Sequence, residues 1–207
     1  MRLPATNLFS ELLKEAEELL KRVGLVRAKQ KFSIRQNSNI GLIDFQRSTK
    51  SSSERVVFTV NIGVWSDRIA RSSSTSTKSE PTTIEDCHWR ERIGFLSPDR
   101  QDKWWLIESP SDMDAIHTTL LPLLENVAVP SLLRHLSDAV LRDEWLEGNA
   151  PGLTTLQRLM YLIVLLKEIG PTDRIEEVVL ELRQESEGKA TEATVLRHLT
   201  KLGLDDR

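Results

Sequence analysis

The sequence has little of two features that often reveal a protein's class, namely cysteine and long hydrophobic segments. Cys87 is the one cysteine among 207 residues, which excludes an internal disulfide and a zinc or iron–sulfur site built from several cysteines of one chain. The longest apolar run, Leu159–Leu166, is far shorter than the roughly 18 residues that span a membrane. Charged residues interrupt the first 21 positions, so we expect no signal peptide. These absences predict a cytoplasmic protein without a membrane partner.

Motifs of common catalytic and cofactor sites are also missing. Neither the GxxxxGK[ST] loop nor the GxGxxG loop, both of which bind phosphates, occurs in the chain. His117, His135 and His198 stand singly in predicted helices, without the HExxH spacing of a zinc protease. We therefore predict no catalytic residues, no metal ligands and no cofactor.

The sequence does contain enough apolar material for a substantial core. Hydrophobic residues make up 39% and charged residues 29% of the chain, and a chain of this length buries about 70% of its unfolded surface. The net charge of −3 is unevenly divided, because residues 1–110 contain 18 basic and 14 acidic residues whereas residues 111–207 contain 10 and 17. The front of the chain is therefore mildly basic and the tail acidic.

Hydrophobic periodicity predicts a helix and then a sheet in the first half. Thr6–Val23 has apolar residues at the three-to-four spacing of one helix face. Val26–Gln36 and Ile40–Ser48 are strand-like runs on either side of a polar turn. Val56–Trp65 alternates strictly, which is typical of an antiparallel sheet with one face packed on helices. The polar stretch Ser66–Thr83 is expected to be a mobile loop.

The second half is predicted to be mostly helical. Two more strands, Trp89–Leu96 and Lys103–Ile107, precede it. The expected helices are Asp112–Glu125, a short helix that begins at Pro130, Asp138–Leu146, Thr155–Ile169, Thr172–Glu187 and Glu192–Leu202. The fold class is thus α+β, with a mostly antiparallel sheet of about five strands packed with an N-terminal helix and C-terminal helices. The turn-rich Gly148–Gly152 divides an α+β domain, residues 1–147, from a helical C-terminal extension, residues 148–207.

Several short segments, in their order along the chain, carry a family resemblance. They are Gln46-Arg47-Ser48, Phe58–Val64, Asp86–Gly94 with the sequence DCHWRERIG, Asp102–Trp105, and Pro130-Ser131-Leu132. Between about Leu8 and Leu146 this order resembles the uncharacterised bacterial proteins grouped as the domain of unknown function 4304 family. The resemblance implies a compact α+β domain, and it implies no activity, substrate or cofactor.

The densest polar cluster lies in the predicted strand around CHWRER. Because alternate strand residues share a face, His88, Arg90 and Arg92 lie on one side and Cys87, Trp89 and Glu91 on the other. The arginines either form an anion site or pair with nearby carboxylates on a solvated sheet face. This strand register does not explain a glutamate on the core side. Cys87 lacks an identifiable base and is interpreted as a buried structural residue.

Other polar and aromatic residues could act together with the basic side chains of this strand. We define a candidate polar binding face that consists of Gln46, Asn61, His88, Arg90, Arg92 and Trp104. Trp104 and Trp105 could form a stacking platform for a base or sugar. They are adjacent on a strand and therefore face opposite ways, so we favour one in the core and the other over a sheet edge or a helix.

These features leave three hypotheses for function. The preferred hypothesis is a non-catalytic binding or protein-interaction module, whose partner is another protein. The first alternative is an enzyme or ligand-binding protein that acts on an anionic small molecule through His88, Arg90 and Arg92. The second is nucleic-acid binding through the basic N-terminal strands, a partner that we do not expect because the sequence pI is about 5.9 and no RNA-binding signature is present. The sequence gives no signal for the oligomeric state.

Overall fold

A ten-residue strand at the centre of an antiparallel sheet organises the chain. The computed structural model describes residues 3–72 and 80–205. Within these residues the sheet has six strands. They are β1 (Val26–Ala28), β2 (Lys31–Gln36), β3 (Asn39–Arg47), β4 (Val56–Trp65), β5 (Trp89–Arg92) and β6 (Trp105–Ile107). β1 to β4 are neighbours in sequence order, whereas β5 and β6 lie end to end along the edge of β4 that β3 leaves free.

Local backbone geometry explains how the first strands divide. Asn37 and Ser38 both have positive φ, which gives the tight two-residue turn that joins β2 to β3. Lys29 also has positive φ, 60°, and it lies between β1 and β2. The predicted single strand Val26–Gln36 is therefore wrong in one respect, since it is two strands joined by a turn.

Three other sequence predictions need correction. In the predicted loop Ser66–Thr83, residues Asp67–Ser72 form the short helix α2, while residues 73–79 lie outside the described residues. The predicted strand Trp89–Leu96 ends at Arg92, and Ile93–Leu96 forms the helix α3. The short helix predicted to begin at Pro130 begins at Val129, and a π-helical turn joins it without a break to the preceding helix.

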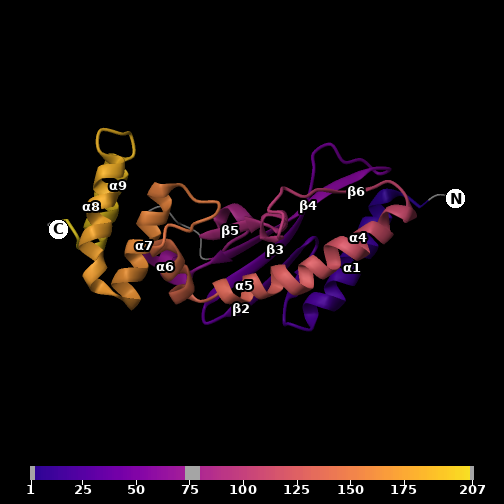
Figure 1. Ribbon diagram of the computed structural model, residues 1–207, viewed down its shortest axis with the longest axis horizontal. Helices are drawn as coiled ribbons and strands as arrows, with labels where there is room; N and C mark the ends of the chain where they lie inside the picture. Colours follow the sequence, from indigo (N-terminus) through magenta and orange to yellow (C-terminus); the bar gives the residue numbers. More distant parts are fainter. Residues whose placement is uncertain (1–2, 73–79, 206–207) are drawn as a thin grey trace.

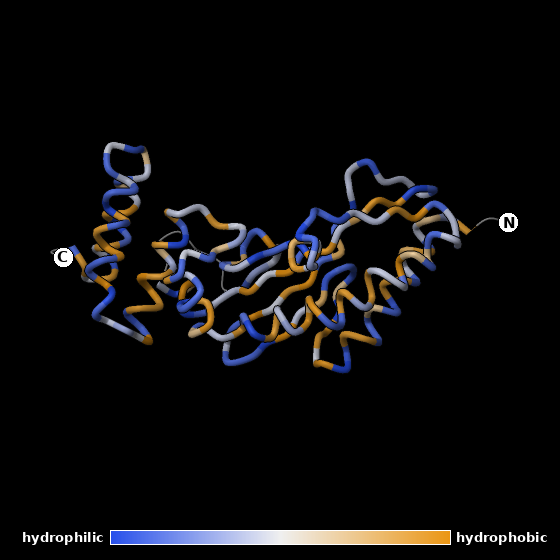
Figure 2. The backbone as a smooth tube through the Cα atoms, viewed as in Figure 1, coloured by the Kyte–Doolittle hydropathy of each residue, from blue (hydrophilic) through white to orange (hydrophobic). Residues whose placement is uncertain are grey.

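One face of the sheet is covered by three helical segments. α1 (Ala5–Lys21) lies beside a long helical rod that consists of α4 (Pro110–Leu123), a π-helical turn at Leu124–Ala128, and α5 (Val129–His135) (Figure 1). Each helix turns its apolar stripe toward the sheet, and Figure 2 shows hydrophobic stretches along the strands and the rod, with hydrophilic turns between elements. The α+β class with an N-terminal helix and C-terminal helices is thus confirmed.

The helical rod is also the one segment of the described chain that is long and apolar enough to cross a membrane. By length and composition alone, Pro110–His135 passes this test with a mean hydropathy of 1.2. Its buried apolar residues belong to the main hydrophobic core; they are Met113, Ile116, Leu120, Leu124, Ala128, Val129 and Leu132. These buried side chains pack in the core of the domain.

The opposite face of the sheet is partly covered by the segment between β4 and β5. Ile40, Leu42, Trp65, Ala70, Ile84 and Cys87 form a second, smaller hydrophobic cluster there. β4 is consequently buried on both faces for most of its length. The alternation of β4 predicted one packed face, but the short helix α2 and the turn Ile84–Asp86 supply a second cover.

The remaining helices extend the molecule away from the N-terminal end (Figure 1). They are α6 (Asp138–Leu146), α7 (Thr155–Ile169), α8 (Ile175–Ser186) and α9 (Glu192–Leu202), with a 3-10 turn at Thr172–Arg174 before α8. Buried residues of these helices and of the sheet belong to the same hydrophobic cluster. A domain division at residue 147 stays a prediction.

Loss of packing at the middle of β4 should destabilise the whole fold. Ile62 is fully buried and belongs to the main core, so Ile62→Ala is expected to lower the free energy of unfolding by about 2–5 kcal/mol. Leu180 is 58% exposed on α8, and Leu180→Ala should change it by less than about 0.5 kcal/mol. Urea unfolding monitored by circular dichroism measures both values. Equal effects of the two substitutions would contradict the assigned core.

Candidate functional site

The chain leaves the sheet between β5 and β6, and residues of this excursion line two hollows. We call residues 93–104 the β5–β6 connection. It begins with α3 (Ile93–Leu96) and returns to the sheet at Trp105. Gly94 packs directly on the returning chain, because a Cβ there would lie 2.1 Å from the carbonyl oxygen of Gln101. The Thr59 hydroxyl of β4 donates to the carbonyl of Lys103 at 2.8 Å and ties the connection to the sheet.

Four of the six predicted site residues meet beside this connection. Gln46, Asn61, Arg90 and Arg92 line a hollow of about 450 Å³, which we call the sheet-face hollow. β3, β4 and β5 supply these side chains, and the register pairs Asn61 with Arg92. The Asn61 side-chain amide donates to Oε1 of Gln46 at 2.7 Å. The alternation of β5 therefore does bring Arg90 and Arg92 to one face.

The guanidinium of Arg90 is engaged by the backbone of two other segments. Its Nε donates to the carbonyl of Gly152 at 3.0 Å, and its Nη1 donates to the carbonyl of Glu85 at 3.0 Å. Residue 152 must be glycine for this contact, since a Cβ would lie 2.6 Å from Cγ of Arg90. Arg90 thus holds the turn before α7 against β5.

Arg92 is paired with a carboxylate and an aromatic ring of the β5–β6 connection. Its Nη1 lies 2.6 Å from Oδ2 of Asp102, and its guanidinium carbon lies 5.4 Å from the ring centroid of Trp104. The indole N–H of Trp104 also donates to Asp102, at 3.1 Å. Trp104 nevertheless remains 42% exposed, and Phe95, which lines the hollow, is 38% exposed.

His88 is placed away from the hollow. Its ring is buried between Trp65 and Tyr161, and Nδ1 accepts a hydrogen bond from the backbone N–H of Ser66 at 2.9 Å. Burial lowers the pKa of His88 to about 3. The ring is therefore neutral at ordinary pH and cannot add charge to an anion site on the sheet face.

Cys87 is also buried, as the sequence analysis expects. Its Sγ would lie 2.8 Å from a Cβ at position 63, so it fills the space above Gly63 of β4. Burial, and next the nearby charge of Asp86, raise the pKa of the thiol to about 12. This environment suits packing and opposes the thiolate form that a nucleophile needs.

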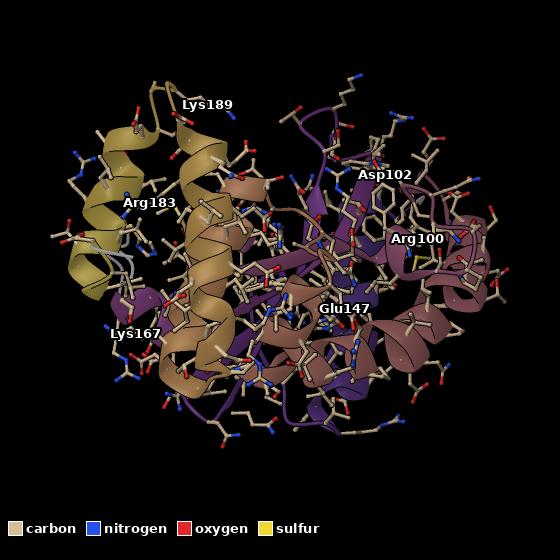
Figure 3. All side chains as sticks on the ribbon, turned by 60° about the vertical axis from the view of Figure 1, so that its left-hand side comes forward. Arg100, Asp102, Glu147, Lys167, Arg183 and Lys189 are labelled. Atoms are coloured by element: carbon tan, nitrogen blue, oxygen red, sulfur yellow. The ribbon has the colours of Figure 1, made fainter. Side chains whose placement is uncertain are left out.

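A second hollow lies on the helix side of β5, and the sequence analysis does not predict it. We call it the helix-side hollow. It encloses about 390 Å³ and is lined from β5, the β5–β6 connection, α5, α6 and the turn before α7. Glu91 and Phe95 line both hollows. Figure 3 shows Arg100 on the connection and Glu147 at the end of α6.

Glu91, which the strand register placed on the core side, lies at this hollow. It pairs with Ile62 in the β4–β5 register, so its side chain leaves the sheet on the helix side. The sheet ends at β5, however, and the glutamate lines the hollow there instead of entering the core. Burial raises the pKa of Glu91, while the backbone N–H of Arg92 and the charge of Arg100 oppose the shift.

A buried histidine–glutamate pair lies in the wall of the helix-side hollow. Nε2 of His135 lies 2.9 Å from Oε2 of Glu144, and Arg134 lies 2.5 Å from the other carboxylate oxygen. The His135 ring stacks on Trp89, with centroids 3.9 Å apart and planes inclined by 16°. His135 and Glu144 are nine residues apart on two helices, so no helical or strand spacing signals that they meet.

The basic residues of the first strands are dispersed in ion pairs and local contacts. Arg27 pairs with Glu17, Arg35 with Glu80 and Arg55 with Glu108; Lys31 donates to the carbonyl of Thr82, and Arg47 lies over the ring of Phe9. These contacts occupy charges that phosphates would otherwise need.

The buried neutral state of His88 should make stability depend on pH. In the unfolded chain this histidine titrates near its ordinary pKa of about 6.5, so the unfolded state binds the extra proton as the pH falls and the folded state does not. We expect the free energy of unfolding to fall between about pH 7.5 and about pH 5, with His88 contributing on the order of 2 kcal/mol. His88→Asn keeps an acceptor for the backbone N–H of Ser66. Between the two pH values, its free energy of unfolding should fall by about 2 kcal/mol less than that of the wild type. Urea titrations at both pH values give the difference, and parallel losses in the two proteins would refute it.

Comparison with known proteins places the sheet and the long helical rod in a recognised family. The family model described as domain of unknown function (DUF4304) matches residues 16–134, more than half of the chain. The match runs from α1 to α5 and includes every described strand, whereas α6 to α9 lie beyond it. No curated protein and no solved structure is found that matches the chain. The chain belongs to the DUF4304 family.

Proposed function

We propose that the protein is a non-catalytic protein-interaction module of the bacterial cytoplasm, and that its contact surface centres on Phe95 and Trp104. The observation that carries the proposal is the exposure of these two aromatic side chains beside the same hollow as Arg90 and Arg92. Tryptophan and arginine are the residues that most often dominate the binding energy of protein interfaces. A partially exposed aromatic pair surrounded by polar groups is therefore suited to a partner protein.

The surroundings of the aromatic pair have the composition of an interface rim. Asn61 donates one hydrogen bond to the side chain of Gln46, and the exposed amide of Gln46 keeps its N–H groups for a partner. Arg92 is held over Trp104 by Asp102, which fixes both side chains before any partner arrives. Side chains that are already ordered lose less conformational entropy on binding.

The alternative of an anionic small molecule receives less support from the sheet-face hollow. Both guanidinium groups have acceptors within the chain, and Glu85, Glu91 and Asp102 also line the hollow. Three carboxylates beside two arginines do not favour an anion. The burial of His88 removes the third cation of that hypothesis. In the basic segment, Arg27, Arg35 and Arg55 are already paired with carboxylates, which weakens the case for nucleic acid.

Affinity capture with a matched pair of variants tests the proposal. The wild-type chain should retain a stoichiometric partner protein from an extract of the cells that encode it, identified by mass spectrometry. The double variant Phe95→Ser, Trp104→Ser should retain at least about tenfold less, because interface aromatics are the costliest residues to truncate.

The control is the double variant Leu180→Ser, Leu196→Ser, which removes two side chains of comparable exposure, 58% and 45%, from α8 and α9. It should capture the partner as well as the wild type does. Undiminished capture by the aromatic variant, or equal losses in both variants, would count against the proposed surface.

A further inference from the structure

The helix-side hollow combines an apolar wall with a charged one. Phe95, Leu96, Pro98 and Pro151 supply apolar surface, while Arg100, Arg134, Glu91, Glu144 and His135 supply charge. Its volume of about 390 Å³ lies in the range of small-molecule sites. Asn149 and Pro151 line it from the turn before α7, so the arginine clamp on Gly152 also shapes this hollow.

The two ring nitrogens of His135 each lie at hydrogen-bonding distance from an oxygen of the wall. Nδ1 lies 2.7 Å from the carbonyl oxygen of Ser131, which can only accept. Nε2 lies 2.9 Å from Glu144, whose other carboxylate oxygen is ion-paired with Arg134. The ring also stacks on Trp89, so His135, Glu144 and Arg134 form one connected polar wall of the hollow.

The charged groups of the hollow are unequally engaged. Its described lining residues include two arginines, Arg100 and Arg134, and two carboxylates, Glu91 and Glu144. Glu144 is already paired with Arg134 and hydrogen-bonded to His135. Burial raises the pKa of Glu91, and the charge of Arg100 opposes that shift.

Two guanidinium groups remain able to donate to a ligand. Within the described part of the chain, Arg100 makes no side-chain hydrogen bond or ion pair, although its charge is felt by Glu91. The Arg134 side chain is 59% exposed and uses Nη1 for Glu144, which leaves its other N–H groups accessible. Guanidinium groups are the side chains best suited to bind carboxylates, with two parallel hydrogen bonds.

We infer that the helix-side hollow binds a carboxylate carried on a small apolar body. Arg100 and Arg134 donate to the carboxylate, and the apolar part contacts Phe95, Leu96 and the two prolines of the wall. The free donors of the two guanidinium groups favour an anionic group, and the apolar wall disfavours a ligand that is polar throughout. The same chemistry is presented by a free short-chain carboxylic acid and by the C-terminus of a peptide with an aliphatic last residue.

Ligand titration followed by NMR tests the inference on the full chain. Butyrate is the probe, and butyramide is its neutral counterpart of the same shape, each added to about 50 mM to cover the weak affinity of so small a ligand. Butyrate should shift the indole N–H signal of Trp89 and the Nε–H signal of Arg100 in a saturable way. Butyramide should bind at least about tenfold more weakly, because it lacks the charge.

Two variants show whether Arg100 carries the interaction. Arg100→Gln should raise the Kd for butyrate about tenfold, through the loss of a charge-assisted hydrogen-bonding group. Arg197→Gln, which alters an arginine on α9, should leave it unchanged. Trp104→Ser should also leave it unchanged, because Trp104 does not line this hollow. Trp104→Ser therefore tests the proposed interaction surface without affecting the proposed carboxylate site, so the two proposals can fail independently.

A peptide arm distinguishes the two sources of the carboxylate. Acetyl-Ala-Leu with a free C-terminus is compared with its C-terminal amide. Tighter binding of the free acid peptide than of butyrate assigns the site to peptide C-termini, and equal or weaker binding assigns it to free acids. The inference is overturned if butyramide binds as well as butyrate, if Arg100→Gln has no effect, or if butyrate produces no saturable shift.

Discussion

The pairing of β4 with two short strands along a single edge is the constraint on which the rest of the structure depends. Asn61–Val64 pair with β5 and Val56–Phe58 pair with β6, so the chain between these strands has no place in the sheet. The β5–β6 connection therefore folds outward as α3 and a turn. That departure puts Phe95, Arg100 and Trp104 on the surface next to the strand residues of both hollows. The register of a central strand thus decides where the candidate binding groups lie.

β5 divides its side chains between the two hollows. Arg90 and Arg92 face the sheet side and Glu91 faces the helix side, as strand alternation requires. Arg90 also connects the sheet to two other segments. Its guanidinium donates to a carbonyl in the turn before β5 and to a carbonyl in the turn before α7. Gly148–Gly152, which the sequence suggests is a linker, becomes a wall of the helix-side hollow. The segment beyond the family match is therefore joined to the site by the hydrogen bond from Arg90 to Gly152 and by the ion pair of Arg134 with Glu144.

The sequence pattern predicted the bounds of several helices and strands correctly. Where one predicted strand proved to be two, the conformation of a single residue was responsible. Val56–Trp65, Asp138–Leu146, Thr155–Ile169 and Glu192–Leu202 are confirmed at both ends. The strand alternates strictly, and glycine or proline residues between the helices mark where they end. Positive φ at Lys29 split a predicted strand, because a turn without glycine gives a weak signal. The pairing of His135 with Glu144 depends on the packing of two helices, and a lone histidine in a helix carries no sign of it. Arg90 was predicted on the binding face, but its carbonyl partners come from distant turns.

Substitution of Gly94 tests most directly whether the β5–β6 connection supports both hollows. A Cβ at this position would meet the carbonyl of Gln101 and the backbone nitrogen of Lys103, so Gly94→Ala must displace the returning chain. The measurement is an NMR amide spectrum of the variant, followed by butyrate titration and partner capture. We predict that the β4 amide signals stay in place while the Arg100 response to butyrate and the capture of the partner are both lost. The dependence of both hollows on the β5–β6 connection would be contradicted by a variant whose connection amide signals have shifted but which binds butyrate and captures the partner as the wild type does.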